Sequence, residues 1–586
     1  MRRVAAYVSI TSLVGVAVAI GAACGGSNGS GFNLDGGETD AATNDDSPFI
    51  NFGDSGGDGT TGCTQCSGDL KSILTCGDNP TVVQTCTGDQ GCGPGGCINA
   101  CDAAAANKSS IGCDYYALPA DGWNQSYSSG GSPGNCFAAF VNNNWSSPMK
   151  VTLVWKGNTI DATPFSYIPQ GSGNAITYQP VPSTGIPSGS MAIVFLNQTN
   201  DAGGSFKVKC PAGTKAAVEN EDMVIHNTSL GHAVEIKTSV PAVVYDVYPY
   251  GGAASYISSA TLLLPTTAWD TNYISMSMST YTSFPPGIDL VAKDDGTKVT
   301  VLPSNAIVGG TGVAASPKNV SVTYNLNHGE IIHLTQTADL SGSVVQSNNP
   351  VGVWGEHFCM VQSNPPKWSI LGAVDGTTLT YDPPVAAGPK TLNRGQLVDF
   401  DGPGAFRVVS QDAQHPFYLA AHRPGFDCDA AHQQIPPIKA LGSEYVAVGN
   451  EPANYGIGGP ETVSVVPPQQ FLKDYIFFTD PTYGWTEIAL TRGKASDNTY
   501  KDVNLDCLGV VTGWTPIGGT QYQSAHVFLA KSKAPVGNCN NGLHKIKSDA
   551  PFGITVWGYD SASSYAYPAG ASVKPINTVV VPPVPN

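Results

Sequence analysis

Charged residues are scarce in this chain of 586 residues. Asp, Glu, Lys and Arg make up 12% of it, and 45 acidic residues outnumber 28 basic ones, which gives a net charge of -17. Such a chain repels phosphate backbones, so we expect no nucleic-acid partner. Long apolar runs are also rare, because no segment after Ile20 is long and apolar enough to span a membrane.

Gly and Pro are abundant where charge is scarce. The chain has 68 Gly and 43 Pro, with 41% hydrophobic residues and a mean hydropathy close to zero. The hydrophobic content predicts a folded body. Abundant Gly and Pro favour short strands and turns over helices, so the composition predicts an all-β fold.

The N-terminus resembles a bacterial lipoprotein signal. Arg2 and Arg3 precede an uncharged run from Val4 to Ile20, and small residues then lead to Cys24. In a lipobox the cysteine becomes the lipidated N-terminus, so we predict a signal peptide over residues 1–24 and lipidation of Cys24. Cleavage near Ala23 without lipidation is the alternative, and a spanning helix is a weaker one. We therefore expect an exported protein, lipid-anchored at a bacterial outer membrane or cell surface.

Two short regions separate this signal from the main body. Residues 25–61 are rich in Gly, Asp and Ser and have almost nothing to bury, so they are predicted to form a disordered acidic tether. Residues 62–115 contain eight cysteines and few apolar residues, which predicts a small module held together by disulfides. An even number of cysteines beyond Cys24 favours disulfides in an exported chain, although the pairing stays open. The candidates are Cys63, Cys66, Cys76, Cys86, Cys92, Cys97, Cys101, Cys113, Cys136, Cys210, Cys359, Cys428, Cys507 and Cys539.

Residues 116–582 repeat four short elements. They are a DGT turn with an alternating strand (295–301, 375–381), an LN-x-G strand (326–334, 392–400), a polar turn with a proline that opens a strand (239–245, 347–354, 410–419, 548–557) and a proline-led strand ending in an aromatic residue (264–273, 436–445, 467–475). The shared order indicates duplication of a three- or four-stranded unit. Units of this kind must stack to bury their apolar faces. We expect an array of short antiparallel sheets, propeller-like in first place and tandem β-sandwiches in second.

These elements together resemble the N-terminal domain family of IgGFc-binding proteins, in the form found in exported myxobacterial proteins. The resemblance covers about residues 100–582 and rests on 347–354, 429–437 with 441–446, the DGT strands and 550–569. It implies an extracellular binding or adhesion role, with no transferable catalytic residues. The segment 429–437 follows 422–428 here, whereas the family pattern places it after 353–360, so a Cys359–Cys428 pair stays open.

Several motifs resemble catalytic or metal-binding sequences but have simpler explanations. Ser55 lies in a GDSGG sequence, but no strands surround it to orient a nucleophile. Cys63 and Cys66 form a CxxC among six further cysteines, which favours disulfides over redox chemistry. A histidine-rich cluster lacks a recurring metal-ligand spacing, so we expect no metal site and no cofactor; its members are His415, His422, Asp427, Cys428, Asp429 and His432. The tether carboxylates lack the pattern of a calcium loop.

Aromatic residues near Gly- and Ser-rich segments are the candidate ligand contacts, because Tyr and Trp often anchor partners. Packing over the core is the equal alternative. They are Tyr248, Tyr250, Tyr256, Trp485, Tyr559, Tyr565 and Tyr567.

The sequence thus predicts a surface lipoprotein, not an enzyme, that binds an unknown extracellular protein or polysaccharide. A structural envelope or coat component is the first alternative. An extracellular hydrolase is the second. It would need a pocket with two acids or with a Ser, His and acid set, and it would gain support from His422 or His432 beside a carboxylate in an open cleft.

Overall fold

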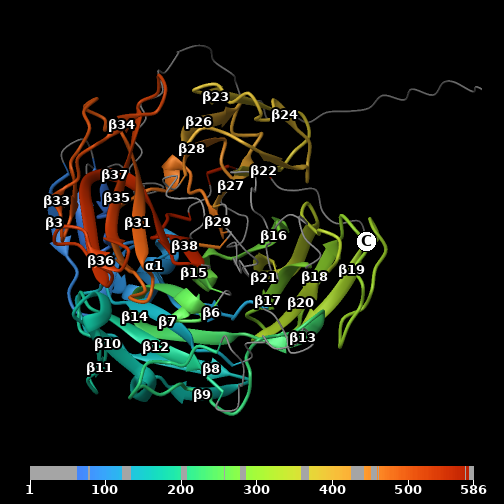
Figure 1. The fold of residues 1–586 in the computed structure, drawn as a ribbon, viewed down its shortest axis with the longest axis horizontal. Helices are drawn as coiled ribbons and strands as arrows, with labels where there is room; N and C mark the ends of the chain where they lie inside the picture. Colours follow the sequence, from blue (N-terminus) through green and yellow to red (C-terminus); the bar gives the residue numbers. More distant parts are fainter. Residues whose placement is uncertain are drawn as a thin grey trace, which may run out of the picture. The chain divides into compact units, whose positions relative to one another are not determined.

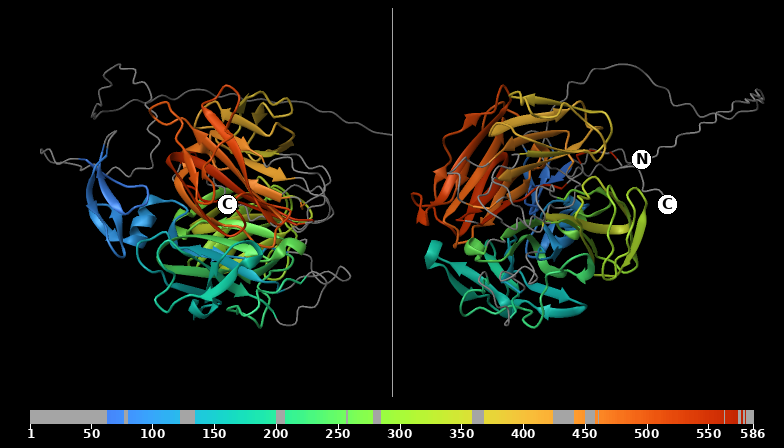
Figure 2. Two further views of the ribbon diagram at one scale, coloured as in Figure 1. Left: turned by 60° about the vertical axis from the view of Figure 1, so that its left-hand side comes forward. Right: turned by 45° about the vertical axis from the view of Figure 1, so that its right-hand side comes forward.

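Strands dominate the computed structural model of the protein (Figures 1 and 2). It describes residues 63–76, 80–121, 134–199, 207–255, 258–277, 285–357, 368–423, 441–449, 458–459, 461–561, 563–573, 576–577 and 579. Strands make up 52% of the structure and helices 5%, so the all-β prediction is confirmed. No described helix is long and apolar enough to cross a membrane.

The cysteine-rich module contains two small sheets and a short helix. Its elements are β1 (Thr64–Cys66), β2 (Ser72–Thr75), β3 (Val82–Thr85), β4 (Gln90–Gly93), β5 (Gly96–Asn99) and α1 (Ala100–Asn107). Asn99 caps α1 by accepting a hydrogen bond from the Cys101 N–H. Three disulfides lie within it, Cys63–Cys76, Cys66–Cys92 and Cys86–Cys97, and a fourth, Cys101–Cys113, joins α1 to the strand that follows it. The predicted disulfide-stapled module is therefore confirmed.

The remaining strands form four copies of one antiparallel unit. The first copy has β6 (Gly112–Ala117), β7 (Phe137–Asn142), β8 (Val151–Trp155), β9 (Asn158–Asp161), β10 (Ser166–Gln170), β11 (Thr177–Pro180), β12 (Met191–Asn197) and β14 (Val234–Tyr248). The second has β16 (Asp270–Ile274), β17 (Pro286–Ala292), β18 (Thr297–Leu302), β19 (Val322–Leu326), β20 (Glu330–Thr335) and β21 (Val344–His357). Between them, β13 (Ser229–His232) pairs with β20, and β15 (Ser259–Leu263) pairs with β14.

The third and fourth copies complete the chain. The third has β22 (Trp368–Gly372), β23 (Thr377–Asp382), β24 (Thr391–Leu392), β25 (Leu397–Phe400), β26 (Ala405–Ser410), β27 (Phe417–Arg423), β28 (Glu444–Val448) and β29 (Glu461–Ser464). The fourth has β30 (Leu472–Phe478), β31 (Trp485–Gly493), β32 (Val503–Leu505), β33 (Gly509–Val510), β34 (Thr515–Pro516), β35 (Tyr522–Lys531), β36 (Ala534–Pro535), β37 (Leu543–Tyr559) and β38 (Ser564–Pro568). Short 3₁₀ turns lie at Thr163–Phe165, Gly173–Ala175, Gly252–Ala254, Thr266–Ala268 and Pro468–Gln470.

A long strand with a proline near its middle organises the first, second and fourth copies. In β14, β21 and β37 the residues before the proline pair with β8, β18 and β32, and those after it pair with β7, β17 and β31. Register shifts opposite the proline mark a bulge. The predicted polar turns at 239–245, 347–354 and 548–557 are therefore wrong, because the chain continues through them as one bent strand. Only in the third copy does it break, between β26 and β27.

These bent strands also explain why the propeller expectation is not met. One strand serves two adjoining sheets, and the described sheets are curled antiparallel half-barrels. Propeller blades would require separate short sheets around an axis. Among the described residues no propeller is formed.

A tyrosine holds the backbone next to the proline in all four copies. Its hydroxyl donates to the carbonyl of the residue after the proline: Tyr115 to Ala242 (2.6 Å), Tyr273 to Val351 (2.8 Å), Tyr445 to Phe417 (2.8 Å) and Tyr475 to Phe552. In the last three, the hydroxyl also accepts the N–H of the residue three positions earlier, at Asp270, Gly442 and Leu472. The contact joins two of the repeated sequence elements, the strand that ends in an aromatic residue and the segment with the strand-opening proline. The sequence alone did not show that these two elements meet. In the third copy the tyrosine strand, β28, follows the proline strand instead of preceding it.

Removing one of these hydroxyls is expected to destabilise its copy. Tyr475→Phe leaves the Leu472 N–H and the Phe552 carbonyl without their shared partner in the core, which costs about 1–3 kcal/mol. Tyr500→Phe is the matched control, because Tyr500 is not fully buried, and we expect a change below about 0.5 kcal/mol there. Urea unfolding of both variants measures the difference, and equal effects would contradict the structural role of the contact.

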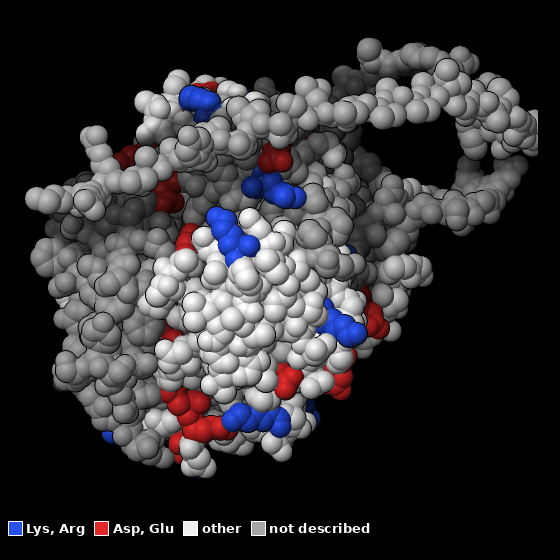
Figure 3. Space-filling model, turned by 90° about the vertical axis from the view of Figure 1, so that its right-hand side faces the viewer, with Lys and Arg blue, Asp and Glu red and all other residues white. Residues whose placement is uncertain are grey.

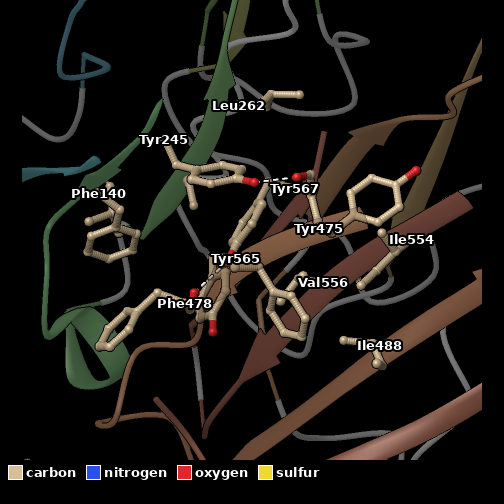
Figure 4. Close-up of a cluster of buried hydrophobic side chains, with 14 of the residues drawn as sticks. Phe140, Tyr245, Leu262, Tyr475, Phe478, Ile488, Ile554, Val556, Tyr565 and Tyr567 are labelled. Carbon is tan, nitrogen blue, oxygen red and sulfur yellow. Dashed lines mark hydrogen bonds between the residues drawn. The ribbon is translucent and has the colours of Figure 1, made fainter. Parts of the chain in front are cut away.

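The first and fourth copies share a core (Figure 4). Phe140 and Tyr245 of the first copy pack with Phe478 and Tyr567 of the fourth, with ring centroids 5.0 Å apart for Phe140–Phe478 and 4.8 Å apart for Tyr245–Tyr567. The hydroxyl of Tyr245 donates to the Ala569 carbonyl, and that of Tyr567 to the Phe478 carbonyl. The ends of the repeated body are thus joined directly.

Candidate functional site

Three equivalent positions on neighbouring strands carry polar side chains in the second and third copies. In the second copy Asp289 on β17 pairs with His333 on β20 and with Trp354 on β21, and Glu356 lies two residues beyond Trp354. In the third copy the same register relates Ser369 on β22, Asp399 on β25 and His422 on β27. Strand pairing alone therefore places each set of three side chains on one face of its sheet.

The second-copy set is a buried cluster of acids and histidines. His333 Nδ1 lies 2.8 Å from Asp289 Oδ1 and 3.4 Å from Glu356 Oε1. Its other nitrogen, Nε2, lies 2.6 Å from Thr335 Oγ1 and 3.6 Å from Asp121 Oδ2. All three residues of the set are no more than 2% exposed. Such burial requires these charges to be paired.

Mutual pairing shifts the protonation of this cluster. Burial disfavours the charged imidazole of His333, but the carboxyls of Glu356 and Asp289 outweigh it and hold the pKa of His333 well above its usual value. Burial raises the pKa of Glu356 well above its usual value, against the opposing effect of His333. For Asp121, burial would raise the pKa, yet hydrogen bonds from His226 and His333 lower it to about 2. The cluster therefore holds protons between its acids and histidines.

The third-copy set forms a hydrogen-bond chain. Ser369 Oγ contacts Asp399 Oδ1, and it lies 2.6 Å from His422 Nε2. His422 Nδ1 in turn lies 2.6 Å from Thr462 Oγ1. Every group in this chain has a partner when Thr462 donates to Nδ1, Nε2–H donates to Ser369 and Ser369 donates to Asp399.

This polarity is the reverse of a serine hydrolase. A nucleophilic serine donates to a histidine whose other nitrogen donates to a carboxylate. Here the carboxylate lies on the serine side, and a threonine occupies the far side of the ring. His422 does lie close to an acid, which would support the hydrolase alternative, but these described contacts do not activate Ser369.

His422 gives the third copy a dependence on pH. Burial lowers the pKa of His422 from 6.5 to about 4, against the opposing effect of the Asp399 carboxylate. A histidine whose folded pKa is depressed stabilises the fold above its unfolded pKa, and this stability is lost as the pH falls from 6.5 towards 4. We expect a loss of no more than about 3 kcal/mol over this window. Urea unfolding at pH 7 and pH 4 measures it, and a His422→Gln variant with an unchanged pH dependence would contradict the assignment.

The first and fourth copies fill the same three positions differently. The first copy has only apolar side chains there, and the fourth has an alanine, a half-buried histidine and a buried tryptophan. The sets are Phe140, Ile193 and Val247 in the first copy and Ala489, His526 and Trp557 in the fourth. The sheet itself therefore does not require polar groups at these positions.

A neutral surface covers part of the second copy. The connection 303–321 between β18 and β19 has Lys318 as its one charged residue. Ile307 and Val313 point into the core and are 2% and 5% exposed, whereas Val308 and Val320 are 65% and 49% exposed. Figure 3 looks onto the side of the molecule where β18 and β19 lie and shows a broad area free of charged side chains, bordered by both signs of charge. We call residues 303–321, with Leu230, the neutral surface.

Hydrogen bonds hold the neutral surface in place. Gln336 accepts from the Val308 N–H at 2.7 Å and donates to the Val308 carbonyl at 3.1 Å. Thr311 forms a parallel bridge with β13, whose Leu230 N–H donates to the Thr311 carbonyl. Leu230 is itself 38% exposed. The exposed apolar side chains are thus presented by a well-connected loop.

Most of the predicted aromatic contacts lie in the core. Tyr248, Tyr250, Tyr559, Tyr565 and Tyr567 are at most 4% exposed, so as ligand contacts these five are wrong. Four of these residues lie in strands and Tyr250 lies in the turn after β14, and the alternative of packing over the core holds. Trp485 is half-buried and stacks on Tyr559 at 6.2 Å. Tyr256 lies outside the described residues.

Twelve of the fourteen disulfide candidates are paired. Besides the four bonds within residues 63–113, Cys136 pairs with Cys210 and Cys507 with Cys539. Cys359 and Cys428 lie outside the described residues, as do Cys24, Ser55, the tether carboxylates and the histidine-cluster members Asp427, Asp429 and His432. His415 pairs with the neighbouring Asp412.

The fold and these positions define a class of protein: an all-β chain built from four related units that differ in the side chains at three equivalent strand positions. A family model described as IgGFc binding protein matches residues 259–366, 350–427 and 448–558. These three matches fall on the second, third and fourth copies, so the resemblance drawn from the sequence is confirmed across 259–558. No curated protein matches the chain.

Sequence reasoning missed the buried second-copy set because each member comes from a different strand. A signal was nonetheless present. Asp289, His333 and Glu356 each interrupt an otherwise apolar strand, in PGIDLVA, EIIHLT and VGVWGEH. One polar residue at an inward position of a strand is costly, and three in one repeat unit indicate a shared location.

Proposed function

We propose that the protein is an exported bacterial lipoprotein that binds an extracellular protein or polysaccharide through the neutral surface. The observation that carries this proposal is the exposure of Val308 and Val320 on one connected loop and of Leu230 on the adjoining strand β13. Exposed apolar groups gathered on a soluble domain mark interaction sites.

The length of the 303–321 connection, compared with its equivalent in the third copy, supports a binding role. In the third copy the equivalent connection between β23 and β24 spans only 383–390, so the 303–321 connection is an extension specific to the second copy. It adds little to the core beyond Ile307 and Val313. An insertion whose other apolar residues face outward is better suited to binding than to folding.

The chemistry of the surface favours a partner with little charge. The chain as a whole carries a net charge of -17, but the neutral surface has a single lysine. A polysaccharide or a neutral protein surface can approach it without desolvating ion pairs. The family resemblance adds an extracellular binding role and does not supply the ligand.

Arrays of polysaccharides and surface proteins test this proposal. The purified ectodomain is expected to bind a limited set of them, and a Val308→Lys, Val320→Lys variant is expected to lose that binding. Val510→Lys is the matched control, because Val510 is 46% exposed on the fourth copy, and it should bind as the wild type does. Absence of any selective binding would overturn the proposal, and self-association on sizing chromatography would favour a structural envelope component.

Lipid anchoring is tested separately. Radiolabelled acyl chains are expected to enter the wild-type protein and not a Cys24→Ser variant expressed in a bacterial host. Equal labelling of the two would count against the anchor and leave export by an ordinary signal peptide.

A further inference from the structure

The fold does not require the polar side chains that are buried at these three positions of the second copy. Asp289, His333 and Glu356 bring two acids and an imidazole into the interior, and burying charge costs free energy. At the same positions of the first copy the same type of sheet is filled by apolar side chains alone. The fold therefore gives no reason for the polar set, and a ligand would give one.

The donor atoms are spaced as a metal ion requires. Single ligand atoms of Asp289, His333 and Glu356 all lie within 4.8 Å of one another. Zinc ligands at 2.0–2.2 Å in a tetrahedral site lie about 3.4 Å apart. The distance from His333 Nδ1 to Glu356 Oε1 is 3.4 Å.

A second observation that points to a metal ion is an unsatisfied oxygen of Asp289. Its Oδ1 accepts from His333 Nδ1, but its Oδ2 is buried and has no hydrogen-bond partner among the described residues. Asp289 is 1% exposed. Because both oxygens of one carboxylate lie at the cluster, Oδ2 is a buried acceptor that a cation beside Nδ1 would satisfy.

The far side of the imidazole is already arranged as in metal sites. A ligating histidine usually donates its other N–H to an oxygen, which fixes the ring. His333 Nε2 lies 2.6 Å from Thr335 Oγ1 and 3.6 Å from Asp121 Oδ2. This leaves Nδ1 facing Asp289 and Glu356.

We propose that Asp289, His333 and Glu356 bind a divalent transition-metal ion such as Zn²⁺. One imidazole nitrogen and two carboxylates suit zinc or manganese. On binding, the ion takes the place of the proton on His333 Nδ1 and of the proton on the Glu356 carboxyl. Both protons leave to solvent, and the charge of the ion offsets those of the two carboxylates. The site is independent of the neutral surface.

Other sets in the described chain do not offer these donors. Asp506, Cys507 and His544 also lie close together, but Cys507 is bonded to Cys539 and cannot supply a thiolate. The third copy has a hydroxyl, Ser369, in place of Asp289. The second copy is therefore where the metal is expected.

Zinc titration of the chelator-treated full ectodomain tests the proposal. Calorimetry is expected to show one Zn²⁺ per chain, with a rise in the midpoint of thermal unfolding. Glu356→Gln should weaken binding by more than the roughly 10- to 100-fold loss expected for the outer partner variant Thr335→Val. His422→Gln, at the position of Glu356 in the third copy, should bind zinc as the wild type does.

Folded wild-type protein that binds no zinc would overturn the proposal, whatever the variants do. Equal binding by wild type and a folded Glu356→Gln variant would overturn it as well. If Glu356→Gln does not fold, Co²⁺ added to the wild type replaces that comparison, and the absence of visible absorption bands from a bound Co²⁺ ion counts against the site.

Discussion

Replacing Cys66 and Cys92 with serine is expected to unfold the cysteine-rich module while the fourth copy stays folded. The disulfide closes a separation of 26 residues, and its loss costs about 3.5 kcal/mol of chain entropy. The module has few apolar side chains to offset this, chiefly Leu70 and Ile73. Limited proteolysis followed by mass spectrometry should detect new cleavage within residues 63–97.

A disulfide of similar span provides the control. Cys507 and Cys539 are separated by 32 residues, so their replacement removes a comparable entropy term. They belong to the large core that the first and fourth copies share. Cleavage of the module in this control variant, or its absence in the first variant, would show that disulfides are not what holds the module.

Trp354→Ala is expected to lower the free energy of unfolding by about 3–5 kcal/mol. Trp354 is 2% exposed, and its ring centroid lies 5.7 Å from that of Trp269, which lies 5.3 Å from Tyr116. This cluster joins β6 of the first copy to β17, β20 and β21 of the second. Truncation therefore leaves a cavity where two copies meet.

Urea unfolding followed by tryptophan fluorescence measures this loss. Trp485→Ala is the comparison, because Trp485 is half-buried and should cost much less. Equal losses in the two variants would mean that the contact between copies does not depend on Trp354.

Much of the fold could be predicted from the sequence. Scarce charge, abundant Gly and Pro, and repeated DGT and LN-x-G segments indicated repeated antiparallel sheets, and the cysteine density indicated the disulfide module. The proline-containing segments could not be interpreted correctly, because a polar turn and a bulge inside a bent strand use the same residues. Ser347-Asn-Asn-Pro350 fits both until the pairing of β21 with β17 and β18 is known.

The first copy could not be recognised from the sequence for a related reason. Its tyrosine strand, β6, begins at Gly112 in a segment dense in cysteines, so the expected boundary between residues 115 and 116 falls inside this strand. Tyr115 reaches Ala242 across 127 positions of sequence. Only the fold shows that this pair corresponds to Tyr273 and Val351.

The predicted ligand contacts failed because neighbouring Gly and Ser suggested loops. Tyr565 and Tyr567 instead lie two residues apart on β38, which pairs with the long strand β37, so both side chains face the core shared by the first and fourth copies. The exposed apolar residues of the 303–321 loop, Val308 and Val320, have no distinctive sequence pattern. Their exposure depends on Ile307 and Val313 taking the inward positions of the same loop.

Hydrogen–deuterium exchange of the ectodomain, with and without a partner selected on the arrays, tests the central claim most directly. Bound partner is expected to slow exchange at residues 303–321 and at β13, with little change in β31 and β37 of the fourth copy. Slowed exchange confined to other copies, with 303–321 unchanged, would contradict the proposal that the neutral surface is the binding site.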